Sequence, residues 1–365
     1  MSGETRSVFL VAHCWEMDLS GAVYRVKLQG GVPLDLEPVY QFFEKEPLPY
    51  LHSQCARIFS NSNSKLYRMV HSDSDAAKPP TFIGYNCAMD TTSETFPAPK
   101  TPKPLGSVVS AYGHIYHIAD PLSGTPECSS NIPNPSFERY KPGQETWETL
   151  PHFPYYIECR YMYICGYAVC HGWILFSLRH MNGVKSQIYA FHIKTQEWHR
   201  VTSGHTGFVG RAVVVDQTIY GLSLSCDKVL VFSFGISYGE EGRNIACSLS
   251  TPIPLQVLDS ALKPSRFSEL TGQLVHLGDK DFCLVQTRDN EYSCVHQDIC
   301  ITTIQIIAGE EGCPMIKTVR STVYTVDTNE LGHFGIYCSF TPELKDVEPE
   351  EGEIVAVQEP AKSKG

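Results

Sequence analysis

Short runs of apolar and β-branched residues recur along the chain, separated by turns rich in Gly, Asp, Asn and His. Some of these runs alternate between apolar and polar positions and others are continuously apolar, and no long segment has the 3.6-residue period of an amphipathic helix. Consecutive runs that flank a turn predict β-hairpins. We expect them at 7–13 with 21–28, 55–59 with 65–70, 107–112 with 114–118, 161–170 with 173–178, 211–215 with 218–222, and 272–277 with 282–286. The pattern predicts an all-β fold.

Two segments in the middle of the chain repeat one arrangement of aromatic residues. Tyr140 ends a strand-like run and is followed seven residues later by Trp147. Phe191 and Trp198 have the same spacing, and the two tryptophans are 51 residues apart. A unit that recurs at about 50 residues is typical of one blade of a β-propeller.

The hairpins are expected to be the inner halves of blades, each followed by an outer pair of strands. Counting them from the first hairpin at Ser7 predicts six blades of four antiparallel strands. Five or seven blades stay open as alternatives, because 235–270 and 300–340 are irregular. A propeller closes its ring by pairing strands from the two ends of the chain, which removes exposed sheet edges. We expect 322–326 and 333–340 to pair with the N-terminal strands in this way. The Pro-rich segment 97–104 is expected to be a connector.

The aromatic–turn–Trp units resemble kelch repeats, and the opening at 8–28 with 36–40 resembles plant kelch-like proteins that consist of little more than a propeller. Kelch blades normally carry a Gly-Gly doublet after an inner strand, whereas this chain has one doublet, Gly30-Gly31. The resemblance implies a kelch-type β-propeller over residues 1–341.

The resemblance also suggests functions known in kelch families, and the sequence can be checked for the modules and motifs that those functions require. Plant F-box kelch proteins carry an F-box of about 40 residues before the propeller, a span long enough for a small module. Strand-like sequence begins here by Ser7, so we expect no F-box. We also expect no helical dimerisation region, and therefore a monomer. Nitrile-specifier proteins hold iron with a Glu-x3-Asp-x3-His string, and no Glu of this chain has Asp four residues on.

The charge of the chain narrows the classes of partner. The net charge is −11 and no Lys or Arg cluster stands out, which disfavours nucleic acid and anionic membranes as partners. Part of the acidity lies in 342–365, which has seven carboxylates and no aromatic residue. We expect this segment to be a disordered, solvated tail.

The 14 cysteines contain no Cys-x-x-Cys pair, and the start of the chain lacks the pattern of a signal peptide. No stretch approaches 18 apolar residues. Reduced thiols in the cytoplasm or nucleus are therefore expected. Cys159, Cys165, Cys170 and His171 suggest a metal site, but their spacing does not fit zinc knuckles. We predict no metal and no cofactor.

Arginines recur at or just before the start of the expected inner strands. We expect them to line one mouth of the central channel, where guanidinium groups bind carboxylate or phosphate in forked geometry. The alternative is that they bond the loops and blades around them. The candidates are Arg6, Arg57, Arg160, Arg211 and Arg266.

Candidate acid–base residues are fewer and less specific. His152, His171 and His205 are expected in turns near the arginines, and Tyr161 is expected to line the same pocket. The leading hypothesis is a binding module that grips an acidic protein segment or a small anionic molecule. The alternatives are a cofactor-free enzyme of plant secondary metabolism (a lyase, isomerase or cyclase) that uses the same cavity, and a scaffold without a ligand.

Overall fold

Nearly every element of the computed structural model is a β-strand, which confirms the all-β prediction. The structure describes residues 5–14, 21–42, 54–59, 64–70, 81–86, 91–103, 106–124, 132–183, 185–201, 207–238, 245–256, 271–289, 295–309, 313–327 and 334–341. Within these ranges there is one short 3-10 helix, η1 (Pro121–Gly124), and no helix long and apolar enough to cross a membrane. The expected tail at 342–365 lies outside them.

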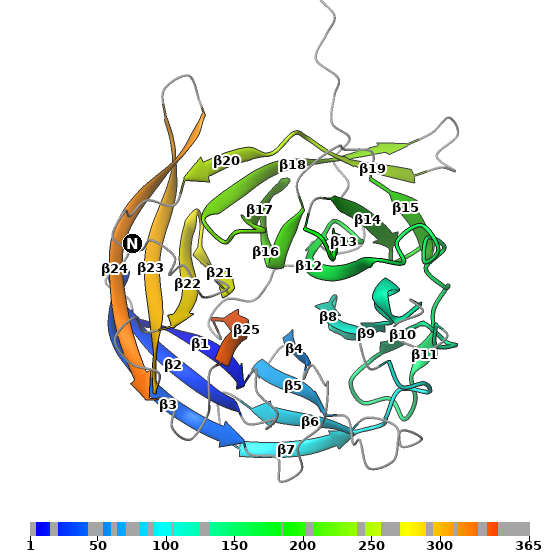
Figure 1. The fold of residues 1–365 in the computed structure, drawn as a ribbon, viewed down its shortest axis with the longest axis horizontal. Coiled ribbons are helices and arrows are strands. Elements are labelled where there is room, and N and C mark those ends of the chain that lie inside the picture. The colour runs from blue at the N-terminus through cyan, green and yellow to red at the C-terminus, as the bar shows by residue number, and fades with distance from the viewer. Residues whose placement is uncertain are drawn as a thin grey trace, which may run out of the picture.

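The strands form four four-stranded sheets and one nine-stranded sheet among the described residues, arranged around a propeller-like ring (Figure 1). The first four-stranded sheet has the order β25 (Phe334–Phe340), β1 (Thr5–Cys14), β2 (Gly21–Gln29), β3 (Val32–Phe42), and the second has β4 (Gln54–Phe59), β5 (Ser64–Val70), β6 (Thr81–Asn86), β7 (Thr91–Phe96). The third has the order β11 (Glu148–Thr149), β10 (Phe137–Tyr140), β9 (His114–Ile118), β8 (Ser107–Ala111). The fourth has β21 (Thr271–Gly278), β22 (Asp281–Asp289), β23 (His296–Ala308), β24 (Pro314–Asp327).

The nine-stranded sheet consists of two four-stranded runs and one additional strand. The first run is β15 (Glu197–Arg200), β14 (Ser186–His192), β13 (Trp173–His180), β12 (Met162–Cys170). The second is β16 (Phe208–Val215), β17 (Thr218–Ser223), β18 (Lys228–Tyr238), β19 (Ile245–Leu249), with β20 (Ile253–Gln256) also paired to β18. A short parallel pairing between β12 and β16 joins the runs. A Cβ atom on Gly166 would lie 2.5 Å from the Phe208 carbonyl oxygen, so only glycine permits this approach.

Ring closure follows the prediction in part. β25 pairs with β1, as expected for 333–340. The expectation for 322–326 is wrong, because that segment belongs to β24 and pairs with β23. β25 takes the innermost place in its sheet, and the hairpin of β1 and β2 therefore supplies the second and third strands rather than the inner half of a blade.

The hydrophobic core lies between neighbouring sheets. One cluster joins β8 to β14 and includes Tyr116, Phe137 and Phe176, which are almost completely buried. A second joins the sheet of β1 and β25 to that of β21–β24. Each cluster draws side chains from two adjacent sheets, so packing between sheet faces holds the ring together.

The two repeated tryptophans perform the same task in successive repeats. Trp147 Nε1 donates to the carbonyl oxygen of Pro97 at 2.7 Å, and Trp198 Nε1 donates to that of Pro151 at 3.1 Å. Each proline follows the outer strand of the preceding sheet, β7 or β11. The aromatic residue seven positions earlier packs on the indole, with ring centroids 5.3 Å apart for Tyr140 and 5.0 Å for Phe191. The spacing read from the sequence thus corresponds to a contact between neighbouring sheets.

Replacing Trp147 by Phe is expected to lower the free energy of unfolding by about 1–2 kcal/mol, because the Pro97 carbonyl loses its donor and the buried ring shrinks. Urea denaturation measures the change. Trp198→Phe should cost less, because Trp198 is only half-buried. A loss under about 0.5 kcal/mol for Trp147→Phe would show that the indole hydrogen bond does not stabilise the ring.

Candidate functional site

The innermost strands surround the centre of the ring (Figure 1). Four of them have register shifts against a neighbouring strand, and the shift in β21 falls at Leu277, next to its turn with β22. In β12 the register with β13 shifts at Cys165, and in β16 the register with β17 shifts across 210–212. In β25 the shift against β1 falls at Tyr337. Bulges redirect side chains and are over-represented beside functional sites. The innermost strands are therefore the first place to expect a functional site.

Arg211 lies in the bulge of β16, directly beside Tyr167 of β12 in the parallel pairing. The preceding Gly210 has a φ of 67°, a left-handed conformation that favours glycine. Both Arg211 and Tyr167 are half-buried. Gln273 of β21 continues the wall, since its Nε2 donates to the Ile336 carbonyl of β25 at 3.3 Å. A cation, a phenol ring and an amide thus come from successive innermost strands.

The arginines predicted from the sequence do not share one mouth of the ring. Arg160 precedes β12, at the side where β12 and β16 begin, and its Cζ lies 5.0 Å from the centre of the Tyr161 ring. Arg6 lies instead in β1, against Gly278 at the end of β21. β21 runs in the same direction as β16, because Gly272 near its start contacts Cys226, which follows β17. Arg6 and Arg160 therefore occupy opposite sides of the ring.

The expectation of one ring of arginines is consequently wrong for Arg6, Arg160 and Arg211, which differ in strand and in height. Arg57 lies in the middle of β4, with its side chain outside the described part of the structure, and Arg266 lies outside the described residues. A ligand-binding role for each arginine stays a prediction.

The acid–base candidates do not converge either. Tyr161 lies just before β12 and His171 just after it, about 30 Å apart at 3.3 Å per strand residue. His171 Nε2 contacts the Asp216 carbonyl at 3.0 Å, and its ring stacks on Phe234. The expectation of histidines and arginines on one face is therefore wrong for His171 and Arg160.

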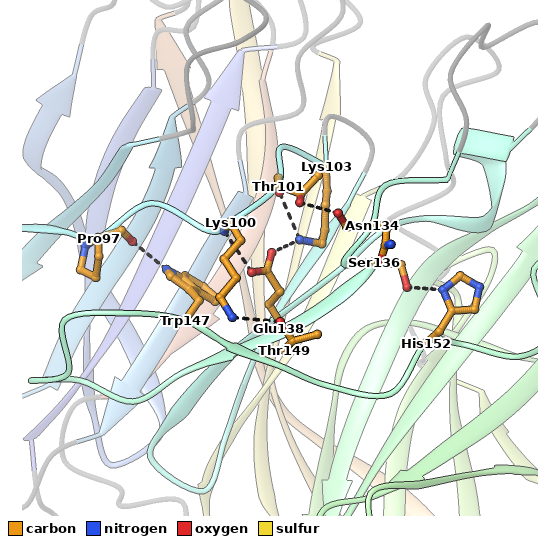
Figure 2. A network of polar contacts seen from close by, with 10 residues as sticks. All are labelled: Pro97, Lys100, Thr101, Lys103, Asn134, Ser136, Glu138, Trp147, Thr149 and His152. Atoms are coloured by element: carbon orange, nitrogen blue, oxygen red, sulfur yellow. Dashed lines mark hydrogen bonds and ion pairs between the residues drawn. The ribbon is translucent and has the colours of Figure 1, made fainter.

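His152 lies at the surface, away from the innermost strands. Its Nδ1 contacts the Ser136 hydroxyl at 2.7 Å (Figure 2), and partial burial lowers its pKa. His205 lies outside the described residues. His152 and His171 thus contact Ser136 and the Asp216 carbonyl, and His205 is the one predicted histidine outside the described residues.

Asp120, which the sequence did not single out, is a buried carboxylate beside the innermost strand β12. It follows β9, and Oδ2 accepts a hydrogen bond from the Ile164 amide at 2.8 Å, one residue before the bulge of β12. Oδ1 accepts the Leu122 amide at 2.9 Å. Burial raises the pKa of Asp120 to about 7, although both hydrogen bonds favour the charged form. Asp120 thus joins the sheet of β8–β11 to the innermost strand of the next sheet, β12.

A second buried polar network links the connection between β7 and β8 to strand β10 (Figure 2). Lys103 and Glu138 form an ion pair in which neither side chain is exposed to solvent. Lys103 Nζ also donates to the Thr101 carbonyl at 3.2 Å, and the Lys100 amide donates to Glu138 Oε1 at 3.0 Å. Burial lowers the pKa of Lys103, and Glu138 opposes this effect. The Pro-rich connector is thus fixed to β10.

The cysteine group that suggested metal binding contacts the protein instead. Cys159 Sγ donates to the Tyr189 hydroxyl at 3.3 Å, and Cys165 Sγ donates to the Ser177 carbonyl at 3.3 Å. Burial raises the pKa of Cys165 to about 11, so its thiol is protonated at neutral pH. In the described ranges no group of three or more His, Cys, Asp or Glu residues could hold a metal ion.

Comparison with solved structures finds distant likenesses. TolB from Acinetobacter baumannii is 10% identical over 92% of this chain and 66% of its own, with a TM-score of 0.43. AztD from Citrobacter koseri is 9% identical over 93% of this chain and 98% of its own, with a TM-score of 0.35. YjhT is 9% identical over 87% and 97%, with a TM-score of 0.35. No curated protein matches the chain.

One family model matches most of the chain. Its description is "Protein of unknown function (DUF1668)", and the match covers residues 37–326. This range runs from within β3 to within β24 and includes β12 and β16 with their bulges. Because the match covers well over half of the sequence, the chain belongs to the DUF1668 family.

Proposed function

We propose that the chain is a kelch-type β-propeller of six four-stranded blades. The two runs of the nine-stranded sheet have the same strand order as the four separate sheets, which supports six equivalent units. The hydrogen bonds from Trp147 to Pro97 and from Trp198 to Pro151 support the kelch type, because the two repeated tryptophans make the same contact in two units. The parallel pairing of β12 and β16 then joins two blades at their innermost strands.

The proposed function of this ring is to bind an anionic ligand, either a small molecule with a carboxylate or phosphate group or an acidic protein segment. Arg211 is the proposed anchor. The observation that carries this proposal is its place in the β16 bulge beside Tyr167. A half-buried guanidinium interacts with an anion more strongly than an exposed one, because water screens it less, and its planar fork fits carboxylate and phosphate.

The rival hypothesis of a cofactor-free enzyme gains less support from the geometry. Tyr161 and His171 lie at opposite ends of β12, and His171 contacts a backbone carbonyl. A reaction needs its acid and base within hydrogen-bond reach of one substrate. A cytoplasmic or nuclear location, and a plant context, stay predictions.

Arg211→Gln is expected to weaken anion binding at least tenfold, because it removes the charge and the forked donor set. Calorimetric titration of the full chain with citrate and with inorganic phosphate measures the effect. Arg211→Lys should retain part of the affinity, because it keeps a point charge.

Lys194→Gln is the matched control, since it removes an exposed cation from the turn between β14 and β15. It should leave both affinities within twofold of the wild type. Failure of the wild-type chain to bind either anion, or equal binding by Arg211→Gln, would contradict the proposal and favour a scaffold without a ligand.

A further inference from the structure

Two large apolar side chains are unusually exposed on the side of the ring where β12 begins. Ile157 is 85% exposed and Met181 is 62% exposed, more than any other large hydrophobic residue in the described part of the chain. Ile157 belongs to the connection between β11 and β12, and Met181 to the loop between β13 and β14. Such exposure costs hydration free energy and often marks an interaction surface.

One backbone hydrogen bond joins the two loops, and further backbone hydrogen bonds fix each loop internally. The Met181 amide donates to the Tyr161 carbonyl at 2.9 Å, and the His180 amide donates to the Lys185 carbonyl at 2.8 Å. The rings of Tyr161 and His180 lie 6.0 Å apart. In the first loop the Cys159 amide donates to the Tyr155 carbonyl at 3.0 Å. Ile157 and Met181 are therefore presented on ordered turns, which lowers the entropy cost of binding.

The surroundings of these residues are basic, although the chain carries a net charge of −11. Arg160 is exposed and lies over the Tyr161 ring, and Lys185 is exposed at the end of the second loop. Arg200, at the end of β15, is 3.6 Å from Glu158, the acidic residue of the first loop. The two loops that carry Ile157 and Met181 thus also carry Arg160 and Lys185, and Arg200 lies beside the first of them. We call Ile157, Arg160, Tyr161, His180, Met181 and Lys185 the rim patch.

We propose that the rim patch docks a short acidic segment of a partner protein, in which one aliphatic side chain covers Ile157 and Met181. An apolar centre with a charged periphery is the usual anatomy of a protein interface. Tyrosine and arginine are enriched among the residues that dominate binding energy, and methionine adapts its shape to a partner. The cations match acidic residues on either side of the aliphatic one.

This surface is separate from Arg211. Arg211 is level with Tyr167 in the strand pairing, whereas the rim patch lies in loops before β12 and after β13. Nucleic acid fits the apolar centre poorly, and the overall negative charge disfavours an anionic membrane. A protein segment satisfies both the apolar and the basic part of the patch.

Panning a phage library of random twelve-residue peptides against the full chain tests the proposal. Enriched peptides should carry Asp or Glu on both sides of an aliphatic residue. Fluorescence anisotropy with the most enriched peptide should show at least tenfold weaker binding by the double variant Ile157→Ser with Met181→Ser. The charge variant Arg160→Glu with Lys185→Glu should lose at least tenfold as well, and its loss should shrink at high salt.

The matched control is Leu34→Ser, which removes another exposed apolar side chain, from β3, and should bind within twofold of the wild type. All the replaced side chains are exposed or flank exposed turns, and unchanged thermal unfolding midpoints verify that the variants fold. Arg211→Gln should bind the peptide like the wild type, so failure here and failure of the anion-binding function are distinguishable.

Four results would overturn the proposal. The first is no enrichment, or enrichment of basic or uncharged peptides. The second is equal peptide binding by the wild type and the Ile157→Ser, Met181→Ser variant. The third is a dimer in light scattering that this variant abolishes, which would assign the patch to contacts between copies. The fourth is binding of phosphatidylserine vesicles that the enriched peptide does not compete with, which would assign it to a membrane.

Discussion

Lys103→Met is expected to lower the free energy of unfolding by about 3–5 kcal/mol. The substitution keeps the length and apolar stem of the side chain but leaves the Glu138 carboxylate buried without its cation. One hydrogen bond from the Lys100 amide remains to it, which cannot replace the lost charge. Urea denaturation followed by tryptophan fluorescence measures the loss.

Two further variants separate the buried charge from simple loss of a lysine. Lys100→Met removes a neighbouring lysine whose exposed Nζ contacts Thr149, and it should cost under about 0.5 kcal/mol. Adding Glu138→Gln to Lys103→Met removes the unpaired charge and keeps an acceptor for the Lys100 amide. This double variant should regain more than half of the lost stability. A Lys103→Met protein within 1 kcal/mol of the wild type would contradict the argument.

Stability should also depend on pH through Asp120. Its pKa is about 7 in the folded chain, against 3.8 for an ordinary aspartate, so the folded state binds this proton more tightly than the unfolded state. The stabilisation is complete below pH 4 and is lost as the pH rises from about 4 to about 7. Relative to Asp120→Asn, the wild type should therefore lose about 3 kcal/mol between pH 5 and pH 8.

Urea denaturation of both proteins at pH 5, 6, 7 and 8 measures this difference. Asp120→Asn also loses one acceptor for a backbone amide, but that cost does not vary with pH. Asp120→Ser removes the charge with a different shape and should give the same pH profile relative to the wild type. A stability difference that stays constant from pH 5 to pH 8 would show that Asp120 titrates as an ordinary carboxylate.

The strands were predictable because their signals are local. The hairpins at 107–118, 161–178 and 211–222 combine β-rich apolar runs with turn residues, and the structure confirms all three. The order of strands within a sheet has no such signal. The run at 7–13 is apolar and β-rich, as expected of an inner strand, yet β25, more than 300 residues later, takes the innermost place beside it. A local pattern identifies a strand but not its neighbours.

The site was harder to predict because the position of a residue along its innermost strand, relative to residues of other strands, is not encoded by sequence distance. Arg160 and Arg211 both lie near the start of an expected strand, but Arg160 stays in the preceding turn while Arg211 enters the bulge. The Lys103–Glu138 pair joins residues 35 positions apart, and Asp120 contacts an amide 44 positions later. Neither contact leaves a local pattern, so only the fold reveals them.

The pairing of β25 with β1 also affects how the chain is made. On the ribosome, strands β1 to β3 emerge before β25, and one edge of β1 has no partner strand until residues 334–340 are translated. At 5–20 residues per second this interval lasts roughly 20–60 seconds. The nascent chain thus keeps one edge of a largely apolar strand unpaired until β25 is made, and a free strand edge is a site at which chains can aggregate.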